Sequence, residues 1–159
     1  MNDAADGRAE YVHHVWPARP VHLAAVRAEV RRWLAPLGLG EATEDDLVLA
    51  VSEAASNAAE HAYLPATAGD TVELSCWVEA RAVCIEIVDH GTWQPPAPVP
   101  GIRGRGLRIM SRLVESMQVR HDGHDTRVLL RHPAEGFHDG AERAATGSPT
   151  GRGTVTARG

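Results

Sequence analysis

The pattern that most restricts the fold is a strict alternation of apolar side chains in two segments joined by three residues. The alternating residues are Val72, Leu74, Cys76 and Val78 in the first segment, and Val83, Ile85 and Ile87 in the second. Successive side chains of a β-strand point to opposite faces, so each segment predicts a strand with one buried face. The connection, residues 79–81, is short enough for a hairpin. A sheet built from such strands is covered on one face only.

Further strands are predicted on both sides of this hairpin. Residues 10–17 alternate loosely, with Val12 and Trp16 facing inward. They end in a proline that cannot donate to a sheet ladder, which favours an edge strand. Residues 116–121 and 126–131 form another predicted pair, joined by a His-Asp-Gly-His-Asp turn.

Three helices are predicted between the strands. In residues 21–37 the apolar positions recur at steps of three and four: Leu23, Val26, Val30, Trp33, Leu34 and Leu37. The central helix is expected to begin at Thr43, with Asp46 as a variant of the capping box, and to end before Pro65. Residues 107–114 form the third. We therefore expect a two-layer α/β sandwich with a mixed, mostly antiparallel sheet and the helices on one face.

Length and charge restrict the organisation and the partners. The 159 residues allow one domain, expected at 10–132, with disordered ends at 1–9 and 133–159. A net charge of −5 disfavours a nucleic-acid partner. Neither a signal peptide nor an apolar run of the ~20 residues that span a membrane is found, which favours a cytoplasmic protein. Cys76 and Cys84 are expected to be reduced core residues.

The central helix carries a polar stripe beside its apolar one. Glu53, Asn57 and His61 are four residues apart, so at about 100° per residue they share one face. The adjoining arc holds small and apolar residues expected in the core: Ala50, Val51, Ala54, Ala55 and Ala58. Such a stripe is typical of a solvated helix surface, and it also offers a carboxylate, an amide and an imidazole at one place. The residues downstream favour the second interpretation.

Those downstream residues have the chemistry of a nucleotide site. Asp89 ends a predicted strand and can accept a hydrogen bond from an exocyclic amine, while Gly91 lets a flat ring approach the backbone, which suits adenine. The Pro- and Gly-rich loop from residue 90 to 103 is long enough to be a lid. The segment Gly104-Arg105-Gly106 then opens a helix, whose free N–H groups suit phosphate.

The polar stripe and a late strand complete the set. The amide oxygen of Asn57 is a ligand acceptable to Mg²⁺. Glu53, one turn earlier, can orient a nucleophile towards a γ-phosphate. Thr126 begins a strand and offers a hydroxyl. Each residue also has a structural interpretation: Asp89 can cap a turn, and Arg105 can be ordinary loop charge.

The order of these motifs resembles a known superfamily. E-x-x-x-N-x-x-x-H-A on a helix, D-x-G at a strand end and G-x-G-L opening a helix, within about residues 11–131, resemble the GHKL ATPases. The DHGTW-x-PP loop and the GRGLRIM segment further resemble the bacterial anti-sigma factors that are also serine kinases. The resemblance implies a Bergerat fold, ATP and Mg²⁺. It also implies a sigma factor and a small antagonist phosphorylated on Ser or Thr as partners, and a homodimer.

The same resemblance implies a role for each motif residue. Asn57 would hold Mg²⁺, Glu53 would be the catalytic base, and Asp89 would bind the adenine amine. Phosphate would be contacted by Gly104, Gly106 and Leu107, with Arg105 between the two glycines. These roles come from the resemblance and not from periodicity.

Two departures from the family pattern stand out. Trp93 replaces the second glycine of the first glycine box, so the family pattern does not define the conformation of the lid. Asp125-Thr126 replaces a Gly-Thr pair, although Thr126 keeps the hydroxyl that could reach adenine through water. Two functions remain: a protein-serine kinase acting on an antagonist, or a regulator that binds ATP and a partner without catalysis. Retention of Glu53 favours the kinase.

Overall fold

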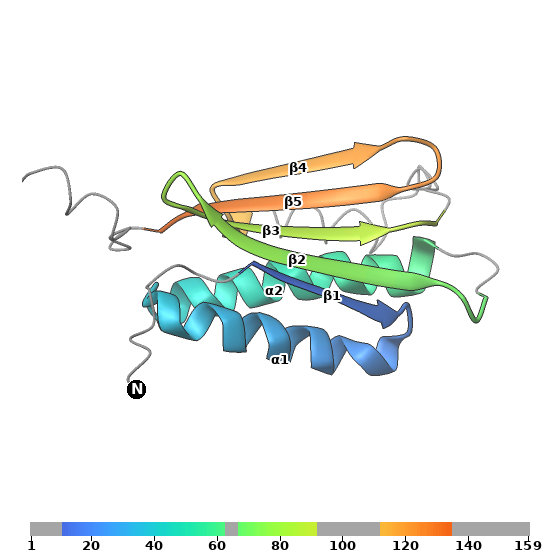
Figure 1. Ribbon diagram of the computed structural model, residues 1–159, viewed down its shortest axis with the longest axis horizontal. Helices are drawn as coiled ribbons and strands as arrows, with labels where there is room; N and C mark the ends of the chain where they lie inside the picture. Colours follow the sequence, from blue (N-terminus) through green and yellow to red (C-terminus); the bar gives the residue numbers. More distant parts are fainter. Residues whose placement is uncertain (1–10, 63–66, 92–111, 135–159) are drawn as a thin grey trace, which may run out of the picture. The chain divides into compact units, whose positions relative to one another are not determined.

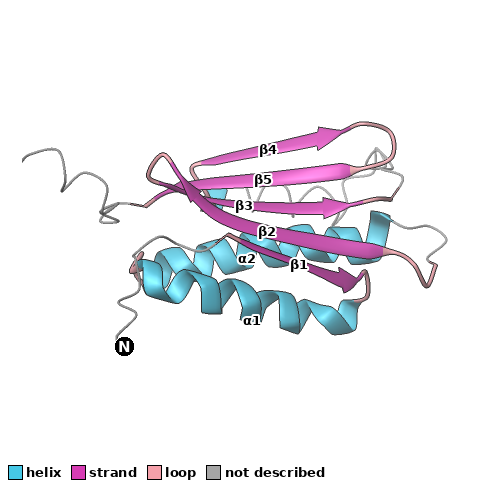
Figure 2. Ribbon diagram, in the orientation of Figure 1, coloured by secondary structure: helices cyan, strands magenta, loops and turns pink. Residues whose placement is uncertain are grey.

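The sheet and the helices form two layers (Figures 1 and 2). The structure is a computed structural model that describes residues 11–62, 67–91 and 112–134, all within one compact unit, residues 9–137. The strands are β1 (Val12–Pro17), β2 (Thr71–Glu79), β3 (Ala82–Asp89), β4 (Ser116–His121) and β5 (Thr126–Pro133). The helices are α1 (Leu23–Leu34) and α2 (Glu41–Asn57), with short 3₁₀ turns η1 (Pro20–His22) and η2 (Ala35–Leu37) and a π-helical turn η3 (Ala58–Ala62).

The five strands lie in the order β1-β2-β3-β5-β4. All four pairings in this sheet are antiparallel. The predicted antiparallel sheet with helices on one face is therefore confirmed, and the parallel pairing that a mixed sheet would include does not occur among these strands. The β5 strand runs two residues past the predicted end, Arg131, because Val83 and Ala82 pair with His132 and Pro133.

The hairpin between β2 and β3 turns on two residues, Ala80 and Arg81. Both have positive φ, 48° and 60°. Two consecutive residues of positive φ form the type of turn whose twist matches that of the flanking strands. Here the turn is made without the usual Asn or Gly, so the pairing of the two long strands enforces a backbone conformation that Ala and Arg adopt with some strain.

The central helix begins two residues earlier than predicted. Its first residue is Glu41 and its N-cap is Gly40, which has a φ of 91° and offers no side-chain cap. The predicted start at Thr43, with Asp46 completing a capping box, is therefore wrong. Gly38 and Gly40 both have positive φ, so the chain can reverse direction in the short connection between η2 and α2. This reversal determines where α2 begins.

The core lies between the helices and one face of the sheet. The predicted apolar and small residues found in it are Val26, Val30, Trp33 and Leu34 of α1, Leu37 of η2, Ala50, Val51, Ala54 and Ala55 of α2, and Ala58 of η3. Leu23 of α1 is partly buried against this core. From the strands it receives the alternating residues Val72, Leu74, Cys76, Val83, Ile85 and Ile87. Cys76 and Cys84 are buried free thiols, as predicted. In the described ranges, no helix has the length and apolar character needed to cross a membrane.

Candidate functional site

The end of β3 carries a buried carboxylate, Asp89. Its exposed fraction is 8%, and it follows Ile87 by two residues, so it faces the same side of the sheet as the core. Burial raises the pKa of Asp89 to about 6, while the hydrogen bond from Gly91, 3.1 Å from N–H nitrogen to Oδ1, and the nearby His90 and His121 oppose the rise. A carboxylate offers about four acceptor positions, so the bond from Gly91 leaves acceptor capacity for a ligand.

Thr126 lies directly opposite Asp89 in the sheet. The two residues are paired across β3 and β5, and Thr126 is 9% exposed. Its Oγ1 lies 3.4 Å from Nδ1 of His121. The register of the sheet thus places a hydroxyl beside the buried carboxylate, although 37 positions separate the two residues in the printed sequence. Asp89 and Thr126 are two predicted site residues that the fold brings together.

Gly91 occupies a position that has no room for a side chain. A Cβ there would lie 2.1 Å from the carbonyl oxygen of Ala62 and 2.8 Å from its Cβ. Ala62 ends the η3 turn, so the missing side chain lets the end of the central helix approach the end of β3. The need for glycine at 91 therefore comes from packing between these two elements. The predicted approach of a flat ring to its backbone stays a prediction.

The polar stripe of α2 runs towards this contact. Glu53 and Asn57 are half-buried beside the buried arc of the helix, and α2 and η3 both contact β3. Asn57 is the last residue of the α-helix, and the next five residues form the π-helical turn. Such turns are rare and occur frequently at functional sites. Ala62, one π-helical turn after Asn57, is the residue that meets Gly91.

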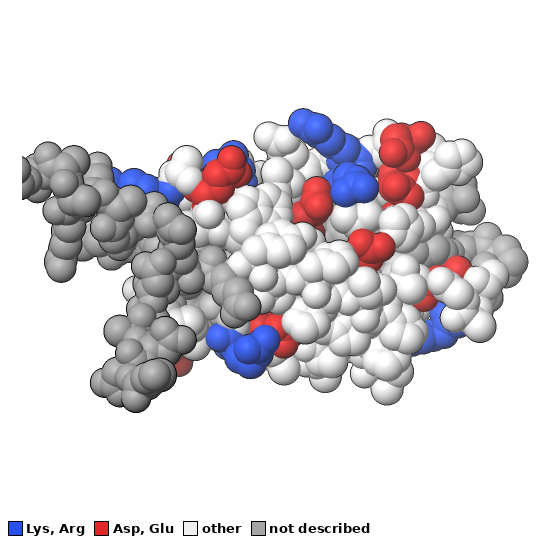
Figure 3. Space-filling view, in the orientation of Figure 1, with Lys and Arg blue, Asp and Glu red and all other residues white. Residues whose placement is uncertain are grey.

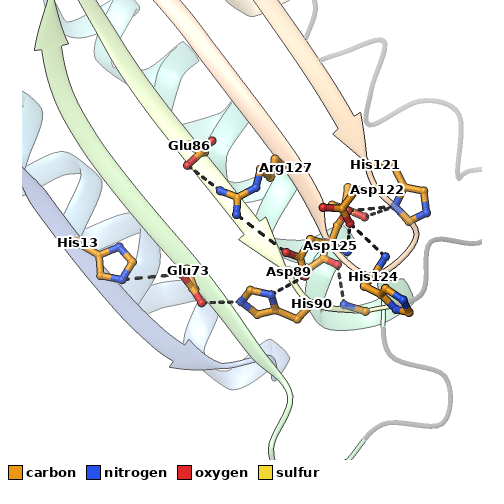
Figure 4. Close-up of polar contacts among 12 residues, drawn as sticks. His13, Glu73, Glu86, Asp89, His90, His121, Asp122, His124, Asp125 and Arg127 are labelled. Carbon is orange, nitrogen blue, oxygen red and sulfur yellow. Dashed lines mark hydrogen bonds and ion pairs between the residues drawn. The ribbon is translucent and has the colours of Figure 1, made fainter.

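A network of charged side chains surrounds the site and was missed by sequence reasoning (Figure 4). His90 Nε2 lies 2.6 Å from Glu73 Oε1 and His90 Nδ1 lies 2.7 Å from Asp125 Oδ1. Arg127 extends the network from β5, with one nitrogen 3.5 Å from Glu86 and another 3.9 Å from Asp125. The Asp-His-Gly segment and the His- and Asp-rich turn were visible in the sequence, but their proximity depends on the order of β2, β3, β5 and β4.

Charge is concentrated near the β4–β5 turn. Figure 3 shows acidic side chains gathered there beside basic ones, while most of the remaining described surface on this face is uncharged. The turn itself contains Asp122 and Asp125. Asp122 accepts backbone N–H groups of His124 and Asp125, at 3.2 and 2.9 Å, and these bonds lower its pKa. The turn that precedes Thr126 is therefore built on carboxylate–backbone bonds and not on the glycine of the family pattern.

The remaining predicted residues lie outside the described residues. These are Gly104, Arg105, Gly106 and Leu107 of the predicted phosphate segment, together with Trp93 and almost all of the predicted lid. The third predicted helix, residues 107–114, is described only from Arg112 onward, where Arg112 and Leu113 are helical and Val114 forms a bend beyond the helix end. Within the described part, the candidate site thus consists of a buried carboxylate, a hydroxyl paired with it, and the polar face of α2, which continues into the η3 turn that meets Gly91. That arrangement can hold an amine donor at Asp89 and a cation or nucleophile along α2.

Comparison with known proteins points to one family. The model of the histidine kinase-like ATPase domain matches residues 16–132. Among curated proteins, the serine-protein kinase RsbW of Oceanobacillus iheyensis is 25% identical over 140 residues, which cover 79% of this chain and 89% of that protein.

Two solved structures are similar to the chain. The structure of the RsbU and RsbW domains of Rv1364c from Mycobacterium tuberculosis has a TM-score of 0.60 and 28% identity, with 78% of this chain and 32% of that chain covered. The histidine kinase domain of the blue-light activated histidine kinase from Erythrobacter litoralis EL346 has a TM-score of 0.52 and 22% identity, with 72% and 64% covered, and it supports the fold alone. The chain thus spans less than two thirds of each of these solved chains.

Proposed function

The chain belongs to the histidine kinase-like ATPase domain family, and from that premise we propose that it is an ATP- and Mg²⁺-dependent anti-sigma regulatory factor. In this proposal it binds a sigma factor and phosphorylates a Ser or Thr of an antagonist protein. The observation that carries the proposal is the buried Asp89 paired with Thr126, at the strand end where the resemblance of the motifs implies an adenine contact. The similarity to the serine-protein kinase RsbW supports the choice of phosphoacceptor.

The residues at the end of β3 suit an adenine nucleotide. A carboxylate that remains ionised in a buried position forms a strong hydrogen bond with an amine donor. Asp89 would accept the exocyclic amine of adenine, and the hydroxyl of Thr126 would reach the ring directly or through water. The predicted phosphate contacts at Gly104, Gly106 and Leu107, with Arg105 among them, complete the proposed nucleotide site.

The polar face of α2 would carry the transfer chemistry. Asn57 would hold Mg²⁺ through its amide oxygen, and bound Mg·ATP would supply the γ-phosphoryl group. Glu53, four residues earlier on the same face, would accept the proton of the attacking hydroxyl. Both side chains are half-buried, which leaves them reachable by a substrate and by solvent.

A phosphotransfer assay tests the proposal. The purified chain is incubated with radiolabelled ATP and Mg²⁺ and with each candidate antagonist protein, and label on Ser or Thr is measured with and without a chelator. Metal-dependent label on one antagonist, together with capture of a sigma factor by the chain, is the expected result. Sedimentation of the same preparation tests the expected homodimer.

The assay also separates the second function. A chain that binds ATP and captures a sigma factor, yet transfers no phosphate to any antagonist, is the non-catalytic partner-switching regulator. A chain that binds no adenine nucleotide contradicts both functions.

A further inference from the structure

The ring of His90 makes two close contacts to which the resemblance assigns no role and which the proposed transfer step does not use. His90 lies in the chain between Asp89 and Gly91, while its ring reaches Glu73 on β2 and Asp125 in the β4–β5 turn (Figure 4). The same side chain therefore connects the end of β3 to the strand on one side and to the turn on the other. That turn leads directly into Thr126.

The two contacts define the protonation state of the ring. A neutral imidazole has one N–H and one lone pair, and ionised carboxylates only accept hydrogen bonds. With both ring nitrogens 2.6–2.7 Å from carboxylate oxygens, a neutral ring would set a lone pair against one of them. The imidazolium donates to both. Consistently, the hydrogen bonds to Glu73 and Asp125 raise the pKa of His90.

Other charged groups face this arrangement from each neighbouring strand. From β1, His13 Nε2 lies 3.8 Å from Glu73 Oε2. From β5, Arg127 lies 3.9 Å from Asp125. Asp89 and His121 are also part of this group of charges. The positive charges of His90 and His121 lower the pKa of Asp89, whereas the negative charge of Asp125 raises it. Loss of the His90 charge would remove one of the positive charges that oppose the effects of burial and of Asp125 on the pKa of Asp89.

Resting on the nucleotide site proposed above, we propose that His90 is a positioning residue whose imidazolium ties the end of β3 to β2 and to the β4–β5 turn and so holds Asp89 and Thr126 for nucleotide binding. The bridge acts in two ways. It keeps the turn before Thr126 in contact with the strand end that carries Asp89. Its positive charge also lowers the pKa of Asp89, in addition to the hydrogen bond from Gly91, and so favours the ionised carboxylate, which is the form that accepts an amine hydrogen bond at full strength.

The bridge is tested first without nucleotide. Ring ¹H, ¹³C and ¹⁵N signals of His90 are followed by NMR as a function of pH in the parent, in Glu73→Gln and in Asp125→Asn. We expect both nitrogens of the parent ring to be protonated at neutral pH, and the pKa to fall in each variant. His124→Gln, which alters a histidine of the same turn outside the bridge, should leave the His90 titration unchanged. A parent ring that is neutral at pH 7 overturns the proposal.

The effect on the site is then measured by isothermal titration of ATP with Mg²⁺ between about pH 5 and pH 9. At pH 7, His90→Gln should weaken ATP about tenfold, roughly 1.4 kcal/mol. Its loss of affinity on acidification should begin at higher pH than in the parent, because Asp89 then protonates more easily. Glu73→Gln, which keeps the histidine, should weaken ATP in the same direction, and His124→Gln should follow the parent. A merely structural role would lower affinity without moving the acid limb.

The outcomes separate the two proposals. If the parent binds no ATP at any pH while the NMR titration shows the imidazolium bridge, the proposed function is wrong and the bridge is structural. If the parent binds ATP and His90→Gln retains both its affinity and its pH profile, the positioning role is wrong and the proposed function stands.

Discussion

Asp89 is an ionisable side chain in a place where ionisation costs stability. It is buried at the core-facing end of β3, and burial raises its pKa to about 6. At neutral pH the carboxylate is still mainly ionised, so the folded protein holds a charge that the unfolded chain would solvate better. Perturbed ionisable groups of this kind concentrate at functional sites. This property agrees with the proposed role of Asp89 in binding a ligand.

Asp89→Asn should therefore weaken ATP and stabilise the fold. Loss of a hydrogen bond to a charged group predicts weaker ATP binding by about 1.5–3 kcal/mol, measured by titration calorimetry. Removal of the buried charge predicts a free energy of unfolding at pH 7 that is higher by about 1–3 kcal/mol, measured in urea.

The pH dependence of stability gives the sign of the predicted change in the free energy of unfolding. Because the folded pKa of Asp89 exceeds the ordinary value of 3.8, the folded state of the parent binds the proton more tightly than the unfolded state. Relative to the variant, the parent then loses stability as pH rises from 3.8 to about 6 and changes no further above that range. The matched control is Asp122→Asn, where backbone bonds lower the pKa and the substitution should cost stability at pH 7. An Asp89→Asn protein less stable than the parent would show that the charge is compensated.

Glu53 should act on turnover and not on nucleotide affinity. We expect Glu53→Gln to slow phosphorylation of the antagonist by roughly 10²–10⁴-fold, the usual share of a general base, while the dissociation constant for ATP stays the same. Asn57→Ala should instead abolish the dependence of binding on Mg²⁺. The control is Asp46→Asn, the same loss of charge at an exposed position of the same helix. Equal rates for Glu53→Gln and the parent would make Glu53 a surface carboxylate.

The contact between η3 and the end of β3 joins the helix layer to the sheet at the candidate site. Backbone atoms of Ala62 occupy the space where a side chain at residue 91 would lie. Backbone atoms cannot turn aside as the end of a flexible side chain can, so any added atom must move one element relative to the other. The close approach of η3 to the end of β3 therefore requires glycine at residue 91.

Gly91→Ala should lower both stability and ATP affinity. Overpacking predicts a free energy of unfolding lower by about 1–3 kcal/mol, measured in urea, and the displaced helix end should weaken ATP as well. Gly69→Ala is the control, because a Cβ there meets nothing within 4 Å and the backbone does not need positive φ. That variant should match or slightly exceed the stability of the parent. Parent-like stability of Gly91→Ala would mean that the two elements are not in close contact.

Nucleotide binding should stabilise the whole domain. A ligand that binds only the folded state adds RT ln(1 + [L]/Kd), about 2.7 kcal/mol when ATP is present at 100 times its dissociation constant. We expect the melting temperature to rise with the concentration of ATP and Mg²⁺ in the parent and to rise much less in Asp89→Asn. GTP, which carries a carbonyl where adenine has its amine, serves as the control ligand. Equal shifts with both nucleotides would contradict the assignment of Asp89 to the adenine amine.

The layered architecture and the family were accessible from local patterns. Alternation with period two and the three- and four-residue steps of the helices report which face of each element is buried, and burial of a face is a property of the element itself. Hence the two layers, the hairpin and the core residues of α1 and α2 were predicted and are confirmed. The resemblance to the GHKL ATPases was based on ordered motifs and is confirmed by the family match.

Contacts between distant elements were not accessible in that way. The pairing of Asp89 with Thr126 depends on the order β3-β5-β4, the bridge of His90 on three elements, and the requirement for Gly91 on the position of Ala62. The start of α2 was missed because a glycine N-cap without a side-chain bond leaves no capping signature in the sequence. The period of the apolar residues in a segment indicates which of its faces is buried in the core. The register of the strands and the close approach of two backbones arise only when all the segments pack together.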